Sequence, residues 1–205
     1  MKKLILTLIK LLSFALYPFF LIKRYIKASP LNRINSYLYS MLLKQNGAKI
    51  GRNLHIGKSF KLKIKGNTDI IIGNNVIIND DVYINVQNGA RLKIGNNVHI
   101  NKGVRISSFK SIIIKDNTLV ASYVNILDHN HKYDLKSPAS IKFYDIAPII
   151  IGEGSWLGTK VQVNKGVTIG DYCIVAANSV VTKNLDNSTV YGGIPAKKIN
   201  VKKNN

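Results

Sequence analysis

The chain has 205 residues, of which 46% are apolar, and this length and composition suit one folded domain with an appendage. Its single cysteine, Cys173, excludes an intrachain disulfide, and no CxxC pair or Cys/His cluster of the structural-zinc type is present. Thirty Lys and Arg residues against ten Asp and Glu residues give a formal net charge of +20. Such a charge predicts an anionic partner, namely membrane lipid, nucleic acid or a phosphorylated small molecule, and a solvated basic surface is the alternative.

The excess positive charge is concentrated near the two ends of the chain. Residues 1–68 hold fourteen Lys and Arg residues and no acid, because Asp69 is the first acidic residue. The C-terminal tail adds four lysines, Lys197, Lys198, Lys202 and Lys203. The sequence contains no helix-turn-helix, RNP or zinc-finger pattern, so nucleic acid is not expected as a partner.

The first predicted element is a helix in the opening segment MKKLILTLIKLLSFALYPFFLIKRYIK. Its apolar run, Leu4–Ile22, covers 19 residues and is ~28 Å long as a helix, just enough to cross a bilayer core. Lys10 lies in the middle of a narrow polar stripe, and Pro18 would kink the helix. These features favour a helix lying in the membrane interface. A transmembrane span and a helix that packs in an oligomer are the alternatives.

A second helix, from about Asn32 to Lys44, leads through Gly47 into the main domain. We therefore expect residues 1–47 to form an N-terminal helical, basic segment that associates with a membrane. The segment lacks a signal-peptide cleavage site, which favours a cytoplasmic protein held at the inner face of the bacterial cell membrane.

A six-residue period dominates the chain from Ile50 onward. Aliphatic residues lead the repeats at Ile72, Ile78, Ile84, Ile94, Ile100, Ile106, Ile114, Val120, Ile126, Ile151, Leu157, Val163, Ile169, Val175 and Val181. Turn-forming Gly, Asn and Asp residues lie between them. Six residues suit one short strand plus one corner, so three repeats close a triangular coil of about eighteen residues. The period predicts an all-β solenoid of stacked parallel strands over residues 48–199, followed by a basic tail at 200–205.

The repeat is interrupted by LDHNHKYDLKSPASIKFYDIAP, residues 127–148. A segment without the repeat is expected to leave the solenoid as a surface loop. It carries two of the chain's four histidines, His129 and His131. From the residues alone, they could be a catalytic base, solvated loop residues, or a metal pair with Asp128 and Asp134.

The repeat pattern, aliphatic–Gly–x–x–small–x, resembles that of the hexapeptide-repeat acyltransferases over about Ile50–Ile199. The resemblance is to the sugar O-acetyltransferases of the galactoside, maltose and xenobiotic acetyltransferase type. It implies a left-handed parallel β-helix, here with N-terminal helices. It also implies acetyl-CoA as co-substrate, no required metal, and a homotrimer whose active sites lie in the clefts between subunits.

In such enzymes a histidine seventeen residues after the leading aliphatic of its coil is catalytic, and counting from Ile114 this is His131. The asparagine that positions the acceptor hydroxyl falls on Asn101, while His129 comes two residues early and is expected to orient the loop or the acceptor. A neutral imidazole can take the proton of an acceptor hydroxyl as that oxygen attacks the thioester.

The resemblance also places acyl-CoA along the C-terminal coils, up to the ending VYGGIPAKKI. It implies cofactor-binding roles for Trp156, Thr159, Ala177, Thr182, Lys183, Lys197 and Lys198. Trp156 has packing as an equal alternative, and the lysines have a general basic surface as theirs. Cys173 occupies a corner position, where we expect a small core residue rather than a nucleophile.

Together, these expectations describe an acetyl-CoA-dependent O-acetyltransferase acting on a sugar hydroxyl of a capsule or O-antigen precursor. The alternatives within enzymes are an N-acetyltransferase acting on a nucleotide-linked amino sugar and a serine O-acetyltransferase. Only about 45 residues precede the solenoid, which leaves no room for the helical domain of the serine enzymes. The non-enzymatic alternative is a membrane-anchored trimeric scaffold.

Overall fold

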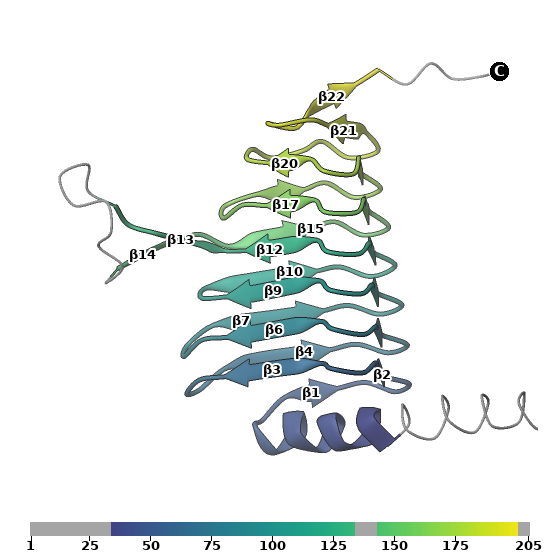
Figure 1. The fold of residues 1–205 in the computed structure, drawn as a ribbon, viewed down its shortest axis with the longest axis vertical. Helices are drawn as coiled ribbons and strands as arrows, with labels where there is room; N and C mark the ends of the chain where they lie inside the picture. Colours follow the sequence, from purple (N-terminus) through teal and green to yellow (C-terminus); the bar gives the residue numbers. More distant parts are fainter. Residues whose placement is uncertain (1–33, 134–142, 201–205) are drawn as a thin grey trace, which may run out of the picture.

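The computed structural model of the protein describes residues 34–133 and 143–200. They form a tall parallel β-solenoid with a helix across its N-terminal end (Figure 1). The fold class predicted from the repeat is confirmed, and the stacking is consistent with a left-handed β-helix. The opening segment and the C-terminal Lys202 and Lys203 lie outside the described residues. No helix in the described part of the chain is long and apolar enough to span a bilayer.

The described chain begins in a helix that ends at residue 45, and Gly47 then turns the chain into the solenoid with a left-handed φ of 80°. This helix closes the open end of the core. Leu43 is only 2% exposed, and the Tyr39 hydroxyl donates a hydrogen bond of 2.7 Å to the Phe60 carbonyl. The helix predicted to lead into the main domain therefore acts as a cap.

Three parallel sheets form the sides of the solenoid, and each coil contributes one strand to each sheet. Sheet A contains β1 (Lys49–Ile50), β4 (Asp69–Ile72), β7 (Arg91–Ile94), β10 (Ser111–Ile114), β15 (Ile149–Ile151) and β18 (Thr168–Ile169). Sheet B contains β2 (His55–Ile56), β5 (Ile77–Ile78), β8 (His99–Ile100), β11 (Leu119–Val120), β16 (Trp156–Leu157), β19 (Ile174–Val175), β21 (Val190–Gly192) and the antiparallel β22 (Lys197–Ile199). Sheet C contains β3 (Lys61–Ile64), β6 (Tyr83–Val86), β9 (Arg105–Ser108), β12 (Asn125–Leu127), β17 (Gln162–Val163) and β20 (Val180–Val181).

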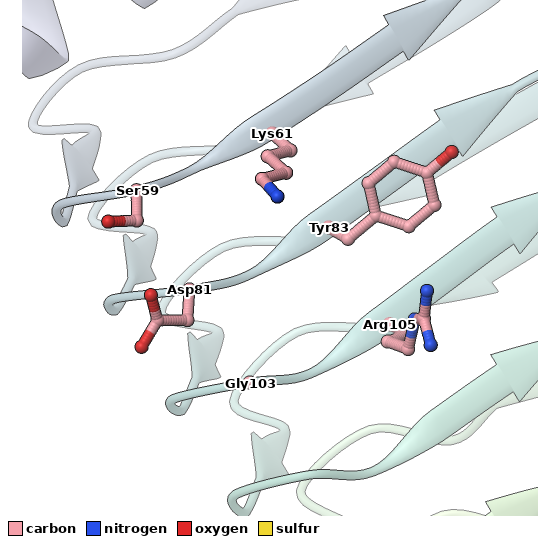
Figure 2. Close-up of a pocket in the computed structure, with 6 residues that line it drawn as sticks. All are labelled: Ser59, Lys61, Asp81, Tyr83, Gly103 and Arg105. Atoms are coloured by element: carbon pink, nitrogen blue, oxygen red, sulfur yellow. The ribbon is translucent and has the colours of Figure 1, made fainter.

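The corners explain the Asn- and Gly-rich spacers of the repeat. Between sheets A and B, side-chain amides hydrogen-bond from coil to coil, at 2.9 Å from Asn53 to Asn75 and 3.0 Å from Asn75 to Asn97. Between sheets B and C, successive corners place Ser59, Asp81 and Gly103 in the left-handed region, with φ of 54°, 59° and 70° (Figure 2). Asn, Asp and Gly tolerate this backbone conformation better than most residues.

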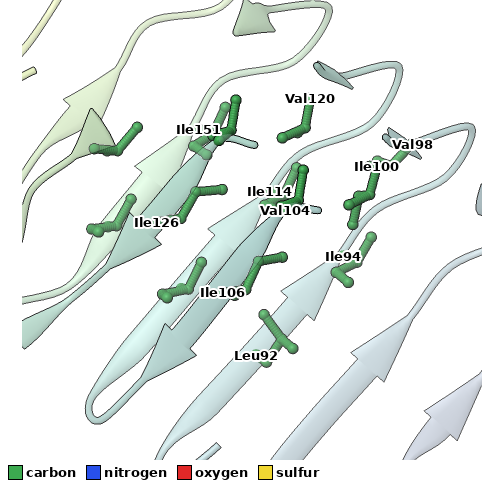
Figure 3. Packing of buried hydrophobic residues seen from close by; sticks show 14 of the residues in the cluster. Leu92, Ile94, Val98, Ile100, Val104, Ile106, Ile114, Val120, Ile126 and Ile151 are labelled. Carbon is green, nitrogen blue, oxygen red and sulfur yellow. The ribbon is translucent and has the colours of Figure 1, made fainter. Parts of the chain in front are cut away.

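The core is a column of aliphatic side chains inside the three sheets (Figure 3). The repeat leaders face inward as predicted, and Ile94, Ile100 and Ile106 are all fully buried. The residue four positions later fills a corner, as shown by Val98 and Val104, which are also 0% exposed. Within every coil the leading residues are six positions apart, which keeps their side chains stacked from coil to coil. Burial of apolar surface is therefore distributed along the whole solenoid.

Candidate active site

The described residues of the interruption form a projecting two-stranded ribbon (Figure 1). β13 (His129–His131) pairs antiparallel with β14 (Tyr144–Ile146), so that His129 lies opposite Ile146 and His131 opposite Tyr144. The sequence predicted only a loop over residues 127–148, because three-residue strands are too short to show a period. We call residues 128–133 together with 143–147 the histidine hairpin.

Asp128 fixes the base of the hairpin. Its buried carboxylate accepts hydrogen bonds from the backbone N–H groups of Phe109 at 2.7 Å, Lys110 at 2.8 Å and Ser111 at 2.8 Å, and from the Ser108 hydroxyl at 3.2 Å. Burial by itself would raise the pKa of Asp128, but the neighbouring His129 ring and the three backbone donors lower it below its ordinary value. The carboxylate therefore stays ionised, and its oxygens are engaged at the corner instead of being free for a metal.

His129 is held against the solenoid. Its ring stacks on Phe109 with centroids 3.7 Å apart and lies 5.6 Å from the Tyr144 ring. Its Nδ1 atom is 3.5 Å from an Asp128 oxygen and has no hydrogen-bond partner among the described residues. The side chain is only 15% exposed. These contacts make His129 a well-ordered residue with little surface for a substrate.

His131 lies two residues further along β13 and therefore on the same face of the ribbon. It is exposed, with its ring centroid 4.7 Å from that of Tyr144. The opposite strand is tied to the solenoid by an ion pair of 2.7 Å between Asp145 and Lys165. The hairpin thus presents His131 to solvent on an anchored support.

Sequence reasoning missed the two aromatic residues of this site, Phe109 and Tyr144. Phe109 belongs to a corner twenty residues before His129, and Tyr144 to the returning strand. Phe109 is a corner residue outside the interruption, and Tyr144 lies within it, where the repeat is absent. No periodic signal therefore marks either residue as part of the site.

Asn101, predicted to position an acceptor, lies at the corner that begins sheet C. Its Oδ1 accepts hydrogen bonds from the Lys102 backbone at 2.8 Å and from the Asn79 side chain at 3.2 Å. The histidine hairpin leaves from the corner that ends sheet C. Within one chain, the structure therefore does not bring Asn101 together with His129 or His131.

The residues predicted to bind CoA fall into separate groups. Trp156 is 50% exposed on the outer face of sheet B, and Thr159 and Ala177 follow at the adjoining corner on successive coils, where the Thr159 carbonyl accepts a 2.9 Å hydrogen bond from Asn178. Thr182 and Lys183 follow β20, at the corner that ends sheet C.

The two predicted phosphate-binding lysines near the end of the chain, Lys197 and Lys198, belong to β22. Lys197 lies opposite Gly192, and Lys198 is 3.9 Å from Asp186. Lys197 and Lys198 thus lie at the terminal end of sheet B, apart from Thr182 and Lys183.

Cys173 is a core residue, as the repeat predicted. It is fully buried, and burial raises the pKa of its thiol to about 11, with a smaller contribution from Asp186. A protonated, inaccessible thiol is a poor nucleophile.

Comparison with known proteins agrees with the repeat and the fold. Residues 148–183 match the family described as bacterial transferase hexapeptide (six repeats). The chain is 38% identical over 102 residues, 46% of its length and 52% of the relative's, to a putative lipopolysaccharide biosynthesis O-acetyl transferase, WbbJ, of Escherichia coli K12. It is 35% identical over 89 residues, 43% of each protein, to the galactoside O-acetyltransferase of the same organism. The chain thus spans about half the length of these curated relatives.

Among solved structures, a variant of AntD, an N-acyltransferase from Bacillus cereus in complex with dTDP and coenzyme A, superposes with a TM-score of 0.64 and 25% identity. The match covers 80% of this chain and 89% of that one. The similarity therefore extends over nearly the whole solenoid, beyond the part matched by sequence.

Proposed function

We propose that the protein is an acetyl-CoA-dependent O-acetyltransferase of the hexapeptide-repeat kind, acting on a sugar hydroxyl of a cell-surface polysaccharide precursor. The observation that carries the proposal is the histidine hairpin, which breaks the repeat at one corner and carries the exposed His131 imidazole three residues beyond the buried Asp128 that anchors it. The similarity to WbbJ, a putative lipopolysaccharide O-acetyl transferase, supports the class of acceptor.

In the proposed reaction, His131 is the general base. Its neutral imidazole takes the proton of the acceptor hydroxyl as the oxygen attacks the thioester carbonyl of acetyl-CoA. The tetrahedral intermediate then collapses, the C–S bond breaks, and the imidazolium returns the proton to the leaving thiolate. The products are a sugar acetate ester and CoA. No acyl-enzyme forms, which is consistent with the burial of Cys173.

His131 is preferred to His129 because of exposure. A base must reach the proton that it removes, and the His129 ring is covered by Phe109 and Tyr144. In this proposal His129 is a positioning residue that links Asp128 to the hairpin, as its 3.5 Å approach to the carboxylate supports.

The cofactor and the acceptor are proposed to meet between subunits. Trp156, Thr159 and Ala177 flank one corner, where the small Ala177 leaves room for the pantetheine arm, while Thr182, Lys183, Lys197 and Lys198 supply further contacts and positive charge. Asn101 lies just before a strand of sheet C and His131 just after one, at opposite ends of the strands. We therefore expect Asn101 to act together with His131 of a neighbouring chain. A homotrimer provides that arrangement, with residues 1–27 holding it at the inner face of the membrane.

A second candidate is N-acylation of an amino sugar linked to a nucleotide. It is favoured by the similarity to AntD, an N-acyltransferase solved with dTDP and coenzyme A. The same general base would serve an ammonium group after loss of one proton. The two candidates differ in the acceptor and share the site.

The test is release of free CoA from acetyl-CoA with a panel of glycans and amino sugars. His131→Ala is expected to reduce the rate by about 10²–10⁴-fold, the contribution of general-base catalysis. Lys49→Ala, which removes an exposed side chain of sheet A, is the control and should retain the wild-type rate. Full activity of the His131 variant together with an inactive His129→Ala variant would transfer the base to His129.

A further inference from the structure

A groove crosses the outer face of the first three coils, away from the histidine hairpin. It has a volume of about 580 Å³ and is lined by Ser59, Lys61, Asp81, Tyr83, Gly103 and Arg105. Figure 2 shows these residues on successive turns, with Ser59, Asp81 and Gly103 at corners and Lys61, Tyr83 and Arg105 on strands of sheet C.

The strand register builds one wall of the groove. Lys61, Tyr83 and Arg105 begin β3, β6 and β9 and lie directly above one another. The Arg105 guanidinium is 5.6 Å from the centroid of the Tyr83 ring. An aromatic face is thus placed between two cationic side chains, a combination that suits a ring together with an anionic group.

The corner residues Ser59, Asp81 and Gly103 build the other wall. Gly103 carries no side chain, and a Cβ added there would lie 2.5 Å from the ring of Tyr123 on the next coil. The Tyr123 ring therefore packs closely over the Gly103 backbone, and this corner accepts no larger residue without a shift of that ring.

The charge in the groove is unbalanced. Within the described part of the chain, neither Lys61 nor Arg105 has an ion-pair partner, whereas the only acid of the groove, Asp81, is 3.4 Å from the Lys102 ammonium. The same column continues on the next coils with Asn125 and Gln162, which carry no charge. The positive charge thus coincides with the groove, and it favours an anion.

We propose that this groove binds the diphosphate of an acceptor sugar that is carried on a nucleotide or on a polyprenyl lipid. The two cations are two strands apart, ~9.6 Å, which allows both to contact one diphosphate. The Tyr83 ring then packs against the neighbouring ring or chain of the carrier. This inference rests on the proposed function, because it specifies the acceptor of that reaction.

The geometry of sheet C links the groove to the hairpin. Arg105 is at one end of β9, and four residues later Phe109 stacks on His129, a span of ~13 Å. Between them, Asn85 donates a 2.9 Å hydrogen bond to Ser107, and both side chains are nearly buried, at 8% exposed each. The groove and the hairpin thus lie at the two ends of the same strands. Gly103 of the groove is two residues from Asn101, so a diphosphate held there would place its sugar beside Asn101, where the proposed function expects the histidine of a neighbouring chain.

The test is calorimetric titration of the full-length protein without acetyl-CoA, at physiological ionic strength, with UDP-glucose, farnesyl diphosphate and free glucose as probes. The double variant Lys61→Ala/Arg105→Gln removes both cations of the groove. Lys49→Ala/Lys93→Ala removes two exposed cations from sheet A and is the matched control. Circular dichroism verifies the fold of each variant.

We expect at least one of the diphosphate probes to bind, free glucose not to bind, and the double variant to weaken the affinity by at least about tenfold. The control should bind as the wild type does. Binding of UDP-glucose alone identifies a nucleotide carrier, binding of farnesyl diphosphate alone a lipid carrier, and binding of both recognition of the diphosphate itself.

The inference is overturned if neither diphosphate binds, or if the groove variant and the sheet A variant weaken binding equally. Transfer of acetyl groups to free sugars would then leave the proposed function standing. Intact diphosphate binding with no CoA release from any acceptor would reject the proposed function while retaining the site.

Discussion

Asp128 is the residue on which the hairpin depends. Replacing it with Asn keeps the shape but turns one acceptor oxygen into an NH₂ group that faces backbone donors. We expect Asp128→Asn to lower the free energy of unfolding by about 1–3 kcal/mol and to reduce CoA release. Denaturant titration measures the first effect. Asp69→Asn, an exposed carboxylate on sheet A, is the control and should leave both nearly unchanged.

The same residue predicts a pH dependence. The folded state lowers the pKa of Asp128, so its charged form contributes stability above the unfolded pKa of about 3.9, and this contribution is lost as the pH falls through the lower folded value. The stability difference between wild type and Asp128→Asn should therefore be full at neutral pH and shrink in acid. Unfolding titrations at a series of pH values test this, and a difference that grows toward acid would contradict it.

At the residue scale, the sequence predicted the positions that the repeat or the resemblance marks. It did not predict contacts between residues that lie far apart along the chain. The burial of Cys173 followed from its corner position. The anchoring of Asp128 did not, because its partners are backbone N–H groups at a corner formed seventeen to nineteen residues earlier. The roles of His129 and His131 stay predictions.

The hairpin is the element in which structure and prediction differ most. Its attachment depends on the stacking of His129 on Phe109, so Phe109→Ala should loosen it. Amide exchange should then increase in β13 and at Lys132, whose N–H donates a 2.8 Å hydrogen bond to the Phe143 carbonyl, while the solenoid strands stay protected. Tyr133→Ala removes a 74% exposed aromatic side chain of the same hairpin, and its exchange should match the wild type.

The other elements were predictable because each repeats the same physical rule. An aliphatic side chain every six residues must face inward on every coil, and a polar corner must follow it. The hairpin follows no such rule. Its short antiparallel strands are stabilised by contacts with the solenoid, which local sequence does not encode.

For the whole molecule, the outer face of sheet B suggests how copies associate. Leu119, Trp156 and Ile174 lie in register on successive coils and are 48%, 50% and 37% exposed. Exposed apolar columns of this kind favour an interface, and we expect Leu119→Glu to convert the proposed trimer to monomer. Light scattering after size exclusion measures the mass of the wild type and of each variant. Lys93→Glu on sheet A is the control, and a Leu119 variant with the same oligomeric mass as the wild type would contradict this interface.

The basic N-terminus provides the second prediction for the whole molecule. Deletion of residues 1–27 should move the protein from the membrane fraction to the soluble fraction, because the deleted segment carries the apolar run and six of the cations, Lys2, Lys3, Lys10, Lys23, Arg24 and Lys27. Fractionation of cells that express each form tests this. A truncated protein that stays with the membrane would locate the attachment in the solenoid.

The strands before and after the inserted hairpin pair directly with each other. β10 pairs directly with β15, and β12 with β17, so the parallel pairing continues past the inserted hairpin, one residue shorter than on the coil before. Selection can therefore lengthen, shorten or replace the segment between Asp128 and Pro148 with little consequence for the stack beneath it. New acceptor preferences can therefore arise by replacement of this one surface segment, while the solenoid that carries it stays unchanged.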